Sequence, residues 1–210
     1  MVPTIRTLKV QLDGSTGGLL VEREVAMSTK ARATIEDLYH VPENGKAELV
    51  NGELVLMSPT GEAPSRAGGR IYISLDSHER SVGGGYAFPD NAGFIVNLPH
   101  RGSFSPDAAW YRGPLRGSGK FLNGAPALAV EVRSEGDYGA AAEREMAAKR
   151  ADYFTAGTLV VWDVDVLKDR VVRVYRAGDP QRPTVYGSGQ LAEAEPAVPG
   201  WTLPVDDLLP

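Results

Sequence analysis

The sequence has 210 residues, of which 42% are hydrophobic and 23% are charged, and its formal net charge is −5 at pH 7. These are ordinary values for a globular protein, and the length suits one domain with a sizeable core. The absence of cysteine excludes disulfides, zinc–thiolate sites and iron–sulfur clusters, and the acidic balance argues against broad electrostatic attraction to nucleic acid.

The first part of the chain predicts no targeting or membrane segment. The stretch MVPTIRTLKVQLDG lacks the apolar segment of a secretory signal, and no run of about 18 apolar residues occurs anywhere. We therefore expect no membrane segment and a cytoplasmic location. Residues 1–28 contain VQLDGSTGGLLVEREV, which predicts a hairpin or an arm, and residues 29–210 are expected to form a single domain.

The first readable elements of that domain are a helix and a hairpin. TIEDLYHVPENG predicts a short helix with Thr34 as the N-cap of a capping box. In AELVNGELVLM, Asn51-Gly52 separates two alternating apolar runs, which favours a hairpin with a type I′ turn and pairs Glu48 with Val55. A loop, SPTGEAP, and a helix, RAGGRIYISLDSHERS, are expected to follow.

The second half of the chain predicts a sheet with one crossover helix. FPDNAGFIVNL, FSPDAAWYR, ALAVEVRSE, LVVWDVDV and RVVRVYRA are typical of strands, and GPLRGSGKFLNGAP is typical of a surface loop. The clearest helix spans residues 139–156, and the tail is expected to be extended with Trp201 as its anchor. Because residues 127–166 form a strand–helix–strand unit, the fold class is α/β with a mixed central β-sheet flanked by helices.

Glu131 interrupts the apolar strand LAVEV. A buried carboxylate is costly unless a cation or a metal ion pairs with it. By the two-residue period of a strand, Glu131 and Arg133 share one face, whereas Val130 and Val132 share the other. Either Glu131 forms a purely structural pair with Arg133, or it belongs to a site that recruits another cation.

Lys149 is a second candidate site residue. On an ideal helix it falls on the stripe of Ala142, Met146 and Tyr153, so its side chain is expected to point towards the sheet. Two structural alternatives remain open, namely methylene groups that cover the edge of the core and an ion pair with Glu145.

Asp107 and Glu48 add two more carboxylates, although Asp107 also suits a strand entry and Glu48 a solvated hairpin. A carboxylate cluster with one inward lysine supplies hard oxygen ligands for Mg²⁺ or Mn²⁺ and a donor for charge that develops on phosphate. Other site chemistries fail: the histidines are scattered, no GxSxG or GxGxxG occurs, and GPLRGSGKF departs from a phosphate-binding loop at Phe121.

Six stretches in order resemble the Uma-two family of restriction-endonuclease-like proteins, within the PD-(D/E)XK nuclease superfamily: AELVNGELVLMSP, SPDAAWY, LAVEVRSE, EMAAKRADYFTAGTLVVWDVD, RVVRVYR and VPGWTLPVDDLL. The resemblance covers residues 33–209 and implies a sheet of four or five mixed strands flanked by helices. It also implies that Asp107 and Glu131 are the acidic pair, that Lys149 replaces the lysine of the superfamily motif, and that Glu48 completes the metal site. Arg133 stands at the position of that lysine and is a candidate phosphate contact, although arginine cannot act as a base.

The expected function is that of an endonuclease that depends on Mg²⁺ or Mn²⁺ and hydrolyses phosphodiester bonds in DNA. A homodimer would suit the two-fold symmetry of DNA. Two alternatives remain open: a catalytically idle nuclease fold that binds nucleic acid or protein, and a metal-dependent hydrolase with a different substrate.

Overall fold

The computed structural model describes residues 32–41 and 45–210, so the hairpin or arm predicted for residues 1–28 lies outside the described residues. Arg32–Pro210 form one compact unit. Its centre is a six-stranded sheet with the strand order β11-β10-β9-β8-β6-β3. In chain order, these strands are β3 (Tyr86–Pro89), β6 (Ala108–Tyr111), β8 (Leu128–Val132), β9 (Val160–Asp165), β10 (Val171–Arg176) and β11 (Asp179–Tyr186).

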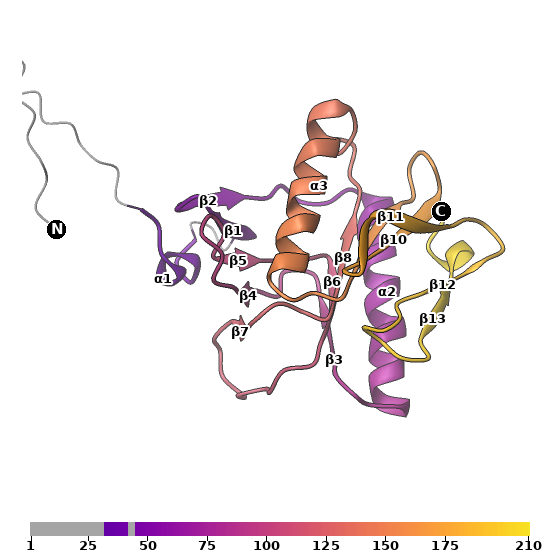
Figure 1. The fold of residues 1–210 in the computed structure, drawn as a ribbon, viewed down its shortest axis with the longest axis horizontal. Coiled ribbons are helices and arrows are strands. Elements are labelled where there is room, and N and C mark those ends of the chain that lie inside the picture. Colours follow the sequence, from indigo (N-terminus) through magenta and orange to yellow (C-terminus); the bar gives the residue numbers. More distant parts are fainter. Residues whose placement is uncertain (1–31, 42–44) are drawn as a thin grey trace, which may run out of the picture. The chain divides into compact units, whose positions relative to one another are not determined.

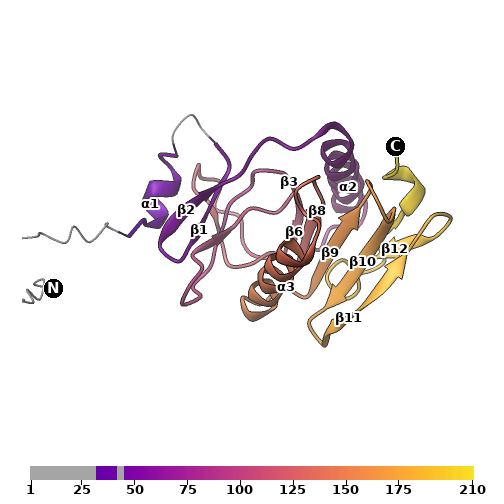
Figure 2. The ribbon, with the colours of Figure 1, turned by 90° about the horizontal axis from the view of Figure 1, so that it is seen from above.

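The sheet is mixed, as the strand–helix–strand unit predicts. Strands β8 and β9 pair in parallel, and the other neighbouring strands pair antiparallel. Helix α3 (Ala140–Thr155) connects the parallel pair and covers one face, whereas α2 (Glu62–Ser81) covers the other face (Figures 1 and 2). The α/β prediction is confirmed, and the sheet has six strands where the family resemblance implies four or five.

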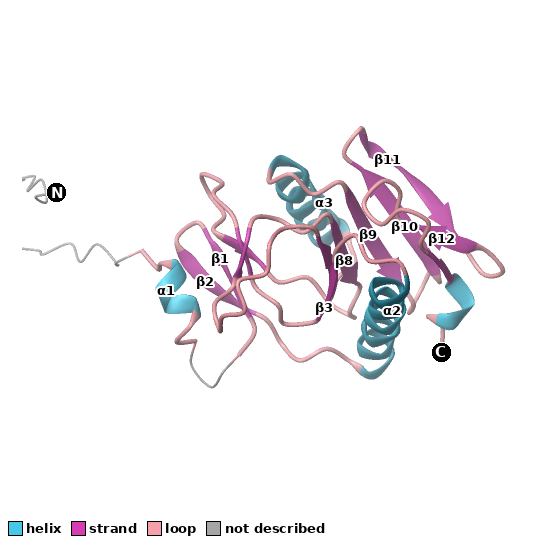
Figure 3. Cartoon of the chain, turned by 90° about the horizontal axis from the view of Figure 1, so that it is seen from below, coloured by secondary structure: helices cyan, strands magenta, loops and turns pink. Residues whose placement is uncertain are grey.

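Smaller elements complete the unit. Helix α1 (Ile35–Leu38) lies beside a hairpin of β1 (Ala47–Val50) and β2 (Glu53–Leu56) (Figure 3). The remaining elements are a three-stranded sheet of β4 (Phe94–Ile95), β5 (Ser103–Phe104) and β7 (Leu122–Asn123), the pair β12 (Leu191–Glu193) and β13 (Thr202–Pro204), and the 3-10 helix η2 (Val205–Asp207). Within residues 32–41 and 45–210, no helix is both long and apolar enough to span a membrane.

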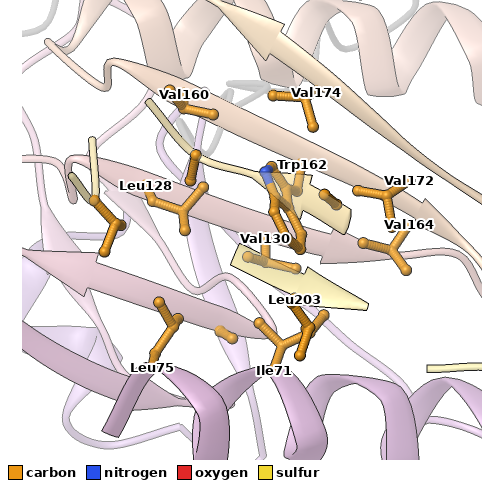
Figure 4. Close-up of a cluster of buried hydrophobic side chains, with 14 of the residues drawn as sticks. Ile71, Leu75, Leu128, Val130, Val160, Trp162, Val164, Val172, Val174 and Leu203 are labelled. Carbon is orange, nitrogen blue, oxygen red and sulfur yellow. The ribbon is translucent and has the colours of Figure 1, made fainter. Parts of the chain in front are cut away.

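Two hydrophobic cores hold the sheet between its helices. On the α2 side, Trp162 is fully buried among aliphatic side chains of β8, β9 and β10 (Figure 4). Its ring stacks on that of Trp201 with centroids 4.9 Å apart, which confirms Trp201 as the anchor of the tail. On the α3 side, Tyr153 is fully buried and stacks on Phe104. Each such side chain contributes about 1.5–3 kcal/mol by leaving water.

The local signals in the first helix and the hairpin are confirmed. Thr34 and Asp37 form the capping box of α1, with the Thr34 amide donating to Asp37 Oδ2 at 2.6 Å. At the hairpin turn, Asn51 has a φ of 53° and Gly52 a φ of 76°. A type I′ turn requires positive φ at both positions, which Asn and Gly adopt more readily than other residues.

Three local predictions are wrong or incomplete. The segment SPTGEAP, which predicts a loop, is helical from Glu62 onwards. Pro64 is compatible with this start because a residue in the first turn of a helix needs no amide hydrogen bond. The run FPDNAGFIVNL is two strands, β3 and β4, separated at Asn91, whose φ is 66°. The loop GPLRGSGKFLNGAP contains the short strand β7, and β11 and β12 were not predicted.

Candidate active site

Glu48 is a hairpin residue that the fold buries, leaving its side chain 4% exposed, and it pairs with Val55 as predicted. Its Oε2 accepts a hydrogen bond from Arg101 at 2.6 Å, and its Oε1 accepts one from the Ser105 amide at 2.9 Å and lies 3.0 Å from Lys149 Nζ. Burial works against ionisation, but Lys149 and Arg101 outweigh it and lower the pKa of Glu48. Glu48 is therefore an ionised, buried carboxylate.

Glu131, the residue that interrupts an apolar strand, meets Lys149 and Tyr153. Its Oε2 accepts a hydrogen bond from Lys149 Nζ at 2.9 Å, and its Oε1 accepts one from the Tyr153 hydroxyl at 2.6 Å. Burial raises the pKa of Glu131, the charges of Asp107 and Glu48 raise it further, and Lys149 opposes them. The groups around Glu131 therefore do not fully offset the cost of burying its ionised form.

Lys149 lies between the two glutamates, on the side of α3 that the stripe predicts. Tyr153 is buried on that side, and Met146 and Lys149 are half-buried. The carboxylate partners of Lys149 are Glu48 and Glu131 rather than a residue of its own helix. Burial works against the ammonium group, but Glu131 and Glu48 outweigh it and raise the pKa of Lys149. The side chain is therefore a positively charged hydrogen-bond donor near neutral pH.

Asp107 stands immediately before β6 and joins it to β8. Its Oδ2 accepts a hydrogen bond from the Val132 amide at 2.8 Å, and its Oδ1 accepts one from Lys46 Nζ at 3.0 Å. Lys46 also donates to Asp90 at 2.6 Å. Because Val132 directly follows Glu131, this hydrogen bond holds Asp107 next to the stretch of β8 that contains Glu131.

Arg133 belongs to a neighbouring ion-pair network. Its guanidinium donates to both carboxylate oxygens of Asp163, at 2.6 and 2.7 Å, and also to Glu143. Its side chain is only 5% exposed. The competition between Arg133 and Lys149 for Glu131 is therefore resolved in favour of Lys149, and Arg133 presents little free surface to a phosphate.

A cleft of about 760 Å³ opens above the glutamates, between the hairpin and α3. Glu48, Glu131 and Lys149 all line it, whereas Asp107 is not among the lining residues. The lining contains four cations, Arg101, Arg133, Lys149 and Arg150, against six carboxylates, Glu48, Glu131, Asp137, Glu145, Asp152 and Asp163. Counting these acidic and basic groups alone, the cleft lining carries a formal excess of two negative charges.

This donor set fits a divalent cation. Asp107 and Glu131 supply carboxylate oxygens, which are the ligands that Mg²⁺ and Mn²⁺ prefer. Among the described residues, no three acidic or histidine side chains converge into a ready-made metal cage. Mg²⁺ is ordinarily held by one or two carboxylates and keeps several of its waters, a mode that Glu131 in the cleft and Asp107 on the neighbouring Val132 amide would suit.

Three site residues escaped the sequence reasoning: Lys46, Arg101 and Tyr153. Tyr153 lies four residues after Lys149 on the same stripe, and Lys46 lies two residues before Glu48, so helix and strand periods could have found both. Arg101 bonds Glu48 and also Asp152, whose Oδ2 accepts from Arg101 Nε at 2.8 Å. No local pattern marks a contact between a loop residue and two distant elements.

The comparisons with known proteins agree with this fold. A crystal structure of "a putative nuclease belonging to DUF820" from Anabaena variabilis aligns with a TM-score of 0.65 and 19% identity, over 83% of this chain and 96% of that one. At this identity the likeness supports the nuclease fold alone. No curated protein matches the chain. A family model described as "Uma2: Putative restriction endonuclease" matches residues 33–206, and the chain therefore belongs to this nuclease family.

Proposed function

We propose that the protein is an endonuclease that uses Mg²⁺ or Mn²⁺ to hydrolyse phosphodiester bonds in DNA. The observation that carries the proposal is the convergence of Glu48, Glu131 and Lys149 from the hairpin, β8 and α3 in one cleft, with Asp107 bonded to the Val132 amide that follows Glu131. Family membership adds weight, because the matched region contains all four residues.

In this proposal, Asp107, just before β6, and Glu131, in β8, are the two metal ligands. Their oxygens would hold a divalent cation, which when bound lowers the pKa of a water and polarises a phosphate. The Val132 amide fixes Asp107, and the Tyr153 hydroxyl fixes Glu131, so both carboxylates are oriented before substrate arrives. Such preorganised groups need not rearrange during the reaction.

Lys149 supplies hydrogen bonds and positive charge rather than a basic group. Because the pKa of Lys149 is raised by Glu131 and Glu48, the ammonium does not lose its proton near neutral pH. It can donate to the attacking water or to a phosphate oxygen on which negative charge develops. Glu48 holds Lys149 in place from the opposite side, and Arg101 in turn holds Glu48.

Calorimetric titration of Mn²⁺ tests the metal site without any assumption about substrate. We expect saturable binding to the wild-type protein and its loss in Glu131→Ala, with circular dichroism showing that the fold is kept. Glu145→Ala is the matched control, because Glu145 lines the same cleft on α3 without contributing to the proposed ligand pair. This control should bind Mn²⁺ like the wild type.

Cleavage of single-stranded and duplex DNA then tests hydrolysis. The wild type with Mn²⁺ or Mg²⁺ should cut DNA, and Glu131→Ala should not. If the wild type binds no metal and cuts neither DNA, the proposal fails and a catalytically idle binding fold takes its place.

A further inference from the structure

We infer that the cleft accepts an unpaired nucleic-acid strand and holds one of its bases between the hairpin β1–β2 and helix α3. The inference rests on the proposed function, which places a phosphodiester above Glu131 and Lys149. It goes further in naming the form of the substrate, a single strand.

The first support is the charge of the cleft. Each cation that lines it lies within 3.7 Å of a carboxylate oxygen, the partners being Glu48 for Arg101, Asp163 for Arg133 and Arg150, and Glu131 for Lys149. Protein–DNA duplex contacts rely on free lysine and arginine side chains that displace counterions from closely spaced phosphates. Arg101, Arg133 and Lys149 donate hydrogen bonds to these carboxylates, and Arg150 is only 15% exposed. Such a cleft favours a ligand with fewer charges along its length, and a single strand carries half the charge of a duplex.

The second support is the apolar surface of the two walls. The hairpin side contributes Val50, Val55 and Met57, and α3 contributes Ala142, Met146 and Ala148. Val55 is 47% exposed, although valine is a residue that folding usually buries. Single strands bind by laying base faces on apolar and aromatic surfaces, and methionine adapts its shape to such a partner.

The third support is the depth of the reactive groups. The side chains of Glu131 and Lys149 are 24% and 21% exposed, and that of Glu48 is 4% exposed. The cleft volume of about 760 Å³ lies in the range of about 300–1,000 Å³ that encloses one small ligand. A phosphate at its base must bring its own nucleoside between the walls, and a base that stays stacked inside a duplex cannot enter.

Fluorescence anisotropy with labelled oligonucleotides tests the inference. The probes are a single strand and a blunt duplex of the same sequence, in Ca²⁺, which takes the same hard oxygen ligands. Electrophoresis checks that the probes stay intact. We expect the single strand to bind about tenfold more tightly than the duplex, as one stacked base would give.

Two neighbouring residues of β2 provide a matched pair of variants. Val55 lines the cleft, whereas Leu56 is 61% exposed and is not among the residues that line it. Val55→Ser should weaken single-strand binding about tenfold and leave duplex binding unchanged, and Leu56→Ser should change neither. Met57→Gln, which nearly preserves volume, gives a second test from the same wall if Val55→Ser misfolds.

The outcomes separate this inference from the proposed function. Tight single-strand binding without cleavage supports the inference and removes the hydrolysis proposal. Equal or tighter duplex binding, no binding of either probe, or equal effects of Val55→Ser and Leu56→Ser would overturn the inference. Cleavage confined to fully paired duplex would overturn it as well, while leaving the nuclease proposal standing.

Discussion

At the scale of single residues, substitution of Lys149 should affect hydrolysis without weakening metal binding. Its Nζ lies 3.0 Å from Glu48 Oε1 and 2.9 Å from Glu131 Oε2. In Lys149→Gln, we expect the rate of DNA cleavage to fall about 10²–10³-fold, because a donor to the developing charge is lost. Mn²⁺ affinity should stay the same or rise, since a positive charge beside the ligands is removed. Cleavage assays and calorimetry measure the two effects.

Lys120→Gln is the matched control for this prediction. It removes the same charge from a side chain that is 63% exposed and stands outside the cleft lining. Cleavage should remain at the wild-type rate. A large fall in Mn²⁺ affinity for Lys149→Gln alone would instead mean that Lys149 is needed to hold the ligand pair in position.

The hydroxyl of Tyr153 gives a prediction for stability. It donates to Glu131 Oε1 at 2.6 Å from a fully buried ring. Tyr153→Phe leaves that oxygen without its donor, so the free energy of unfolding should fall by about 1–3 kcal/mol. Urea denaturation measures the loss. Tyr86→Phe, at a ring that is 37% exposed, should be nearly neutral, and a similar loss there would contradict the argument.

Sequence periodicity predicts the face on which a single side chain lies, because successive residues of a strand or helix are related by a fixed geometry. The strand period placed Glu131 and Arg133 on one face, and the helix period turned Lys149 towards the sheet. It could not decide which cation meets Glu131, because that depends on how α3 packs across β8 and β9. Asp163, opposite Glu131 on β9, engages Arg133 and leaves Glu131 to Lys149.

At the scale of elements, Arg101 forms ion pairs with both the hairpin and α3. It bonds Glu48 of β1 and Asp152 of α3 and is 9% exposed. Arg101→Met removes one partner from each carboxylate, while Glu48 keeps Lys149 and Asp152 keeps His100. We therefore expect the free energy of unfolding to fall by about 1–3 kcal/mol. The matched control is Arg80→Met, which breaks an exposed pair with Asp76 and should cost about 0–1 kcal/mol. Urea denaturation of both variants compares them.

The stability of the connection after β9 depends on pH, because Asp165 accepts hydrogen bonds from it. Burial opposes its ionisation, but hydrogen bonds from the Lys168 amide and the Tyr138 hydroxyl outweigh burial and lower the pKa of Asp165. Its contribution to stability is therefore complete above its unfolded pKa of about 3.9 and is lost as pH falls through the lower folded value.

The stability difference between the wild type and Asp165→Asn should accordingly be largest near pH 7 and shrink as pH approaches 3. Urea denaturation at several pH values measures it. Asp179→Asn, in an exposed pair with Arg182, should show a small difference at every pH. A difference for Asp165→Asn that grows on acidification would contradict the sign worked out above.

The sequence predicts elements that carry a clear local pattern, such as the hairpin and α3, but it does not predict the edge strand β11. The hairpin turn and the crossover helix are set by a dipeptide and by a clear helical stretch. Strand β11 contains Pro180 and Pro183 and has few apolar residues, so its sequence does not look like a strand. It forms because β10 offers a free edge, where a proline that donates no hydrogen bond is tolerated.

At the scale of the whole molecule, charge links metal binding to stability. The chain carries a net charge of −5, and the cleft lining concentrates an excess of two negative charges around a glutamate whose pKa is raised by burial. A cation that binds only the folded state stabilises it by mass action. At about 100 times its dissociation constant, this stabilisation is about 2.7 kcal/mol.

For a protein of this length, about 1 kcal/mol corresponds to about 2–4 °C in Tm. Saturating Mn²⁺ should therefore raise the Tm of the wild type by about 5–10 °C. In Glu131→Ala the rise should vanish, and the variant without metal should unfold at a somewhat lower temperature than the wild type, because the buried Tyr153 hydroxyl loses its acceptor. Calorimetric scans with and without Mn²⁺ measure both. An equal rise in the two proteins would place the metal outside the cleft, because the removed carboxylate could then not be its ligand.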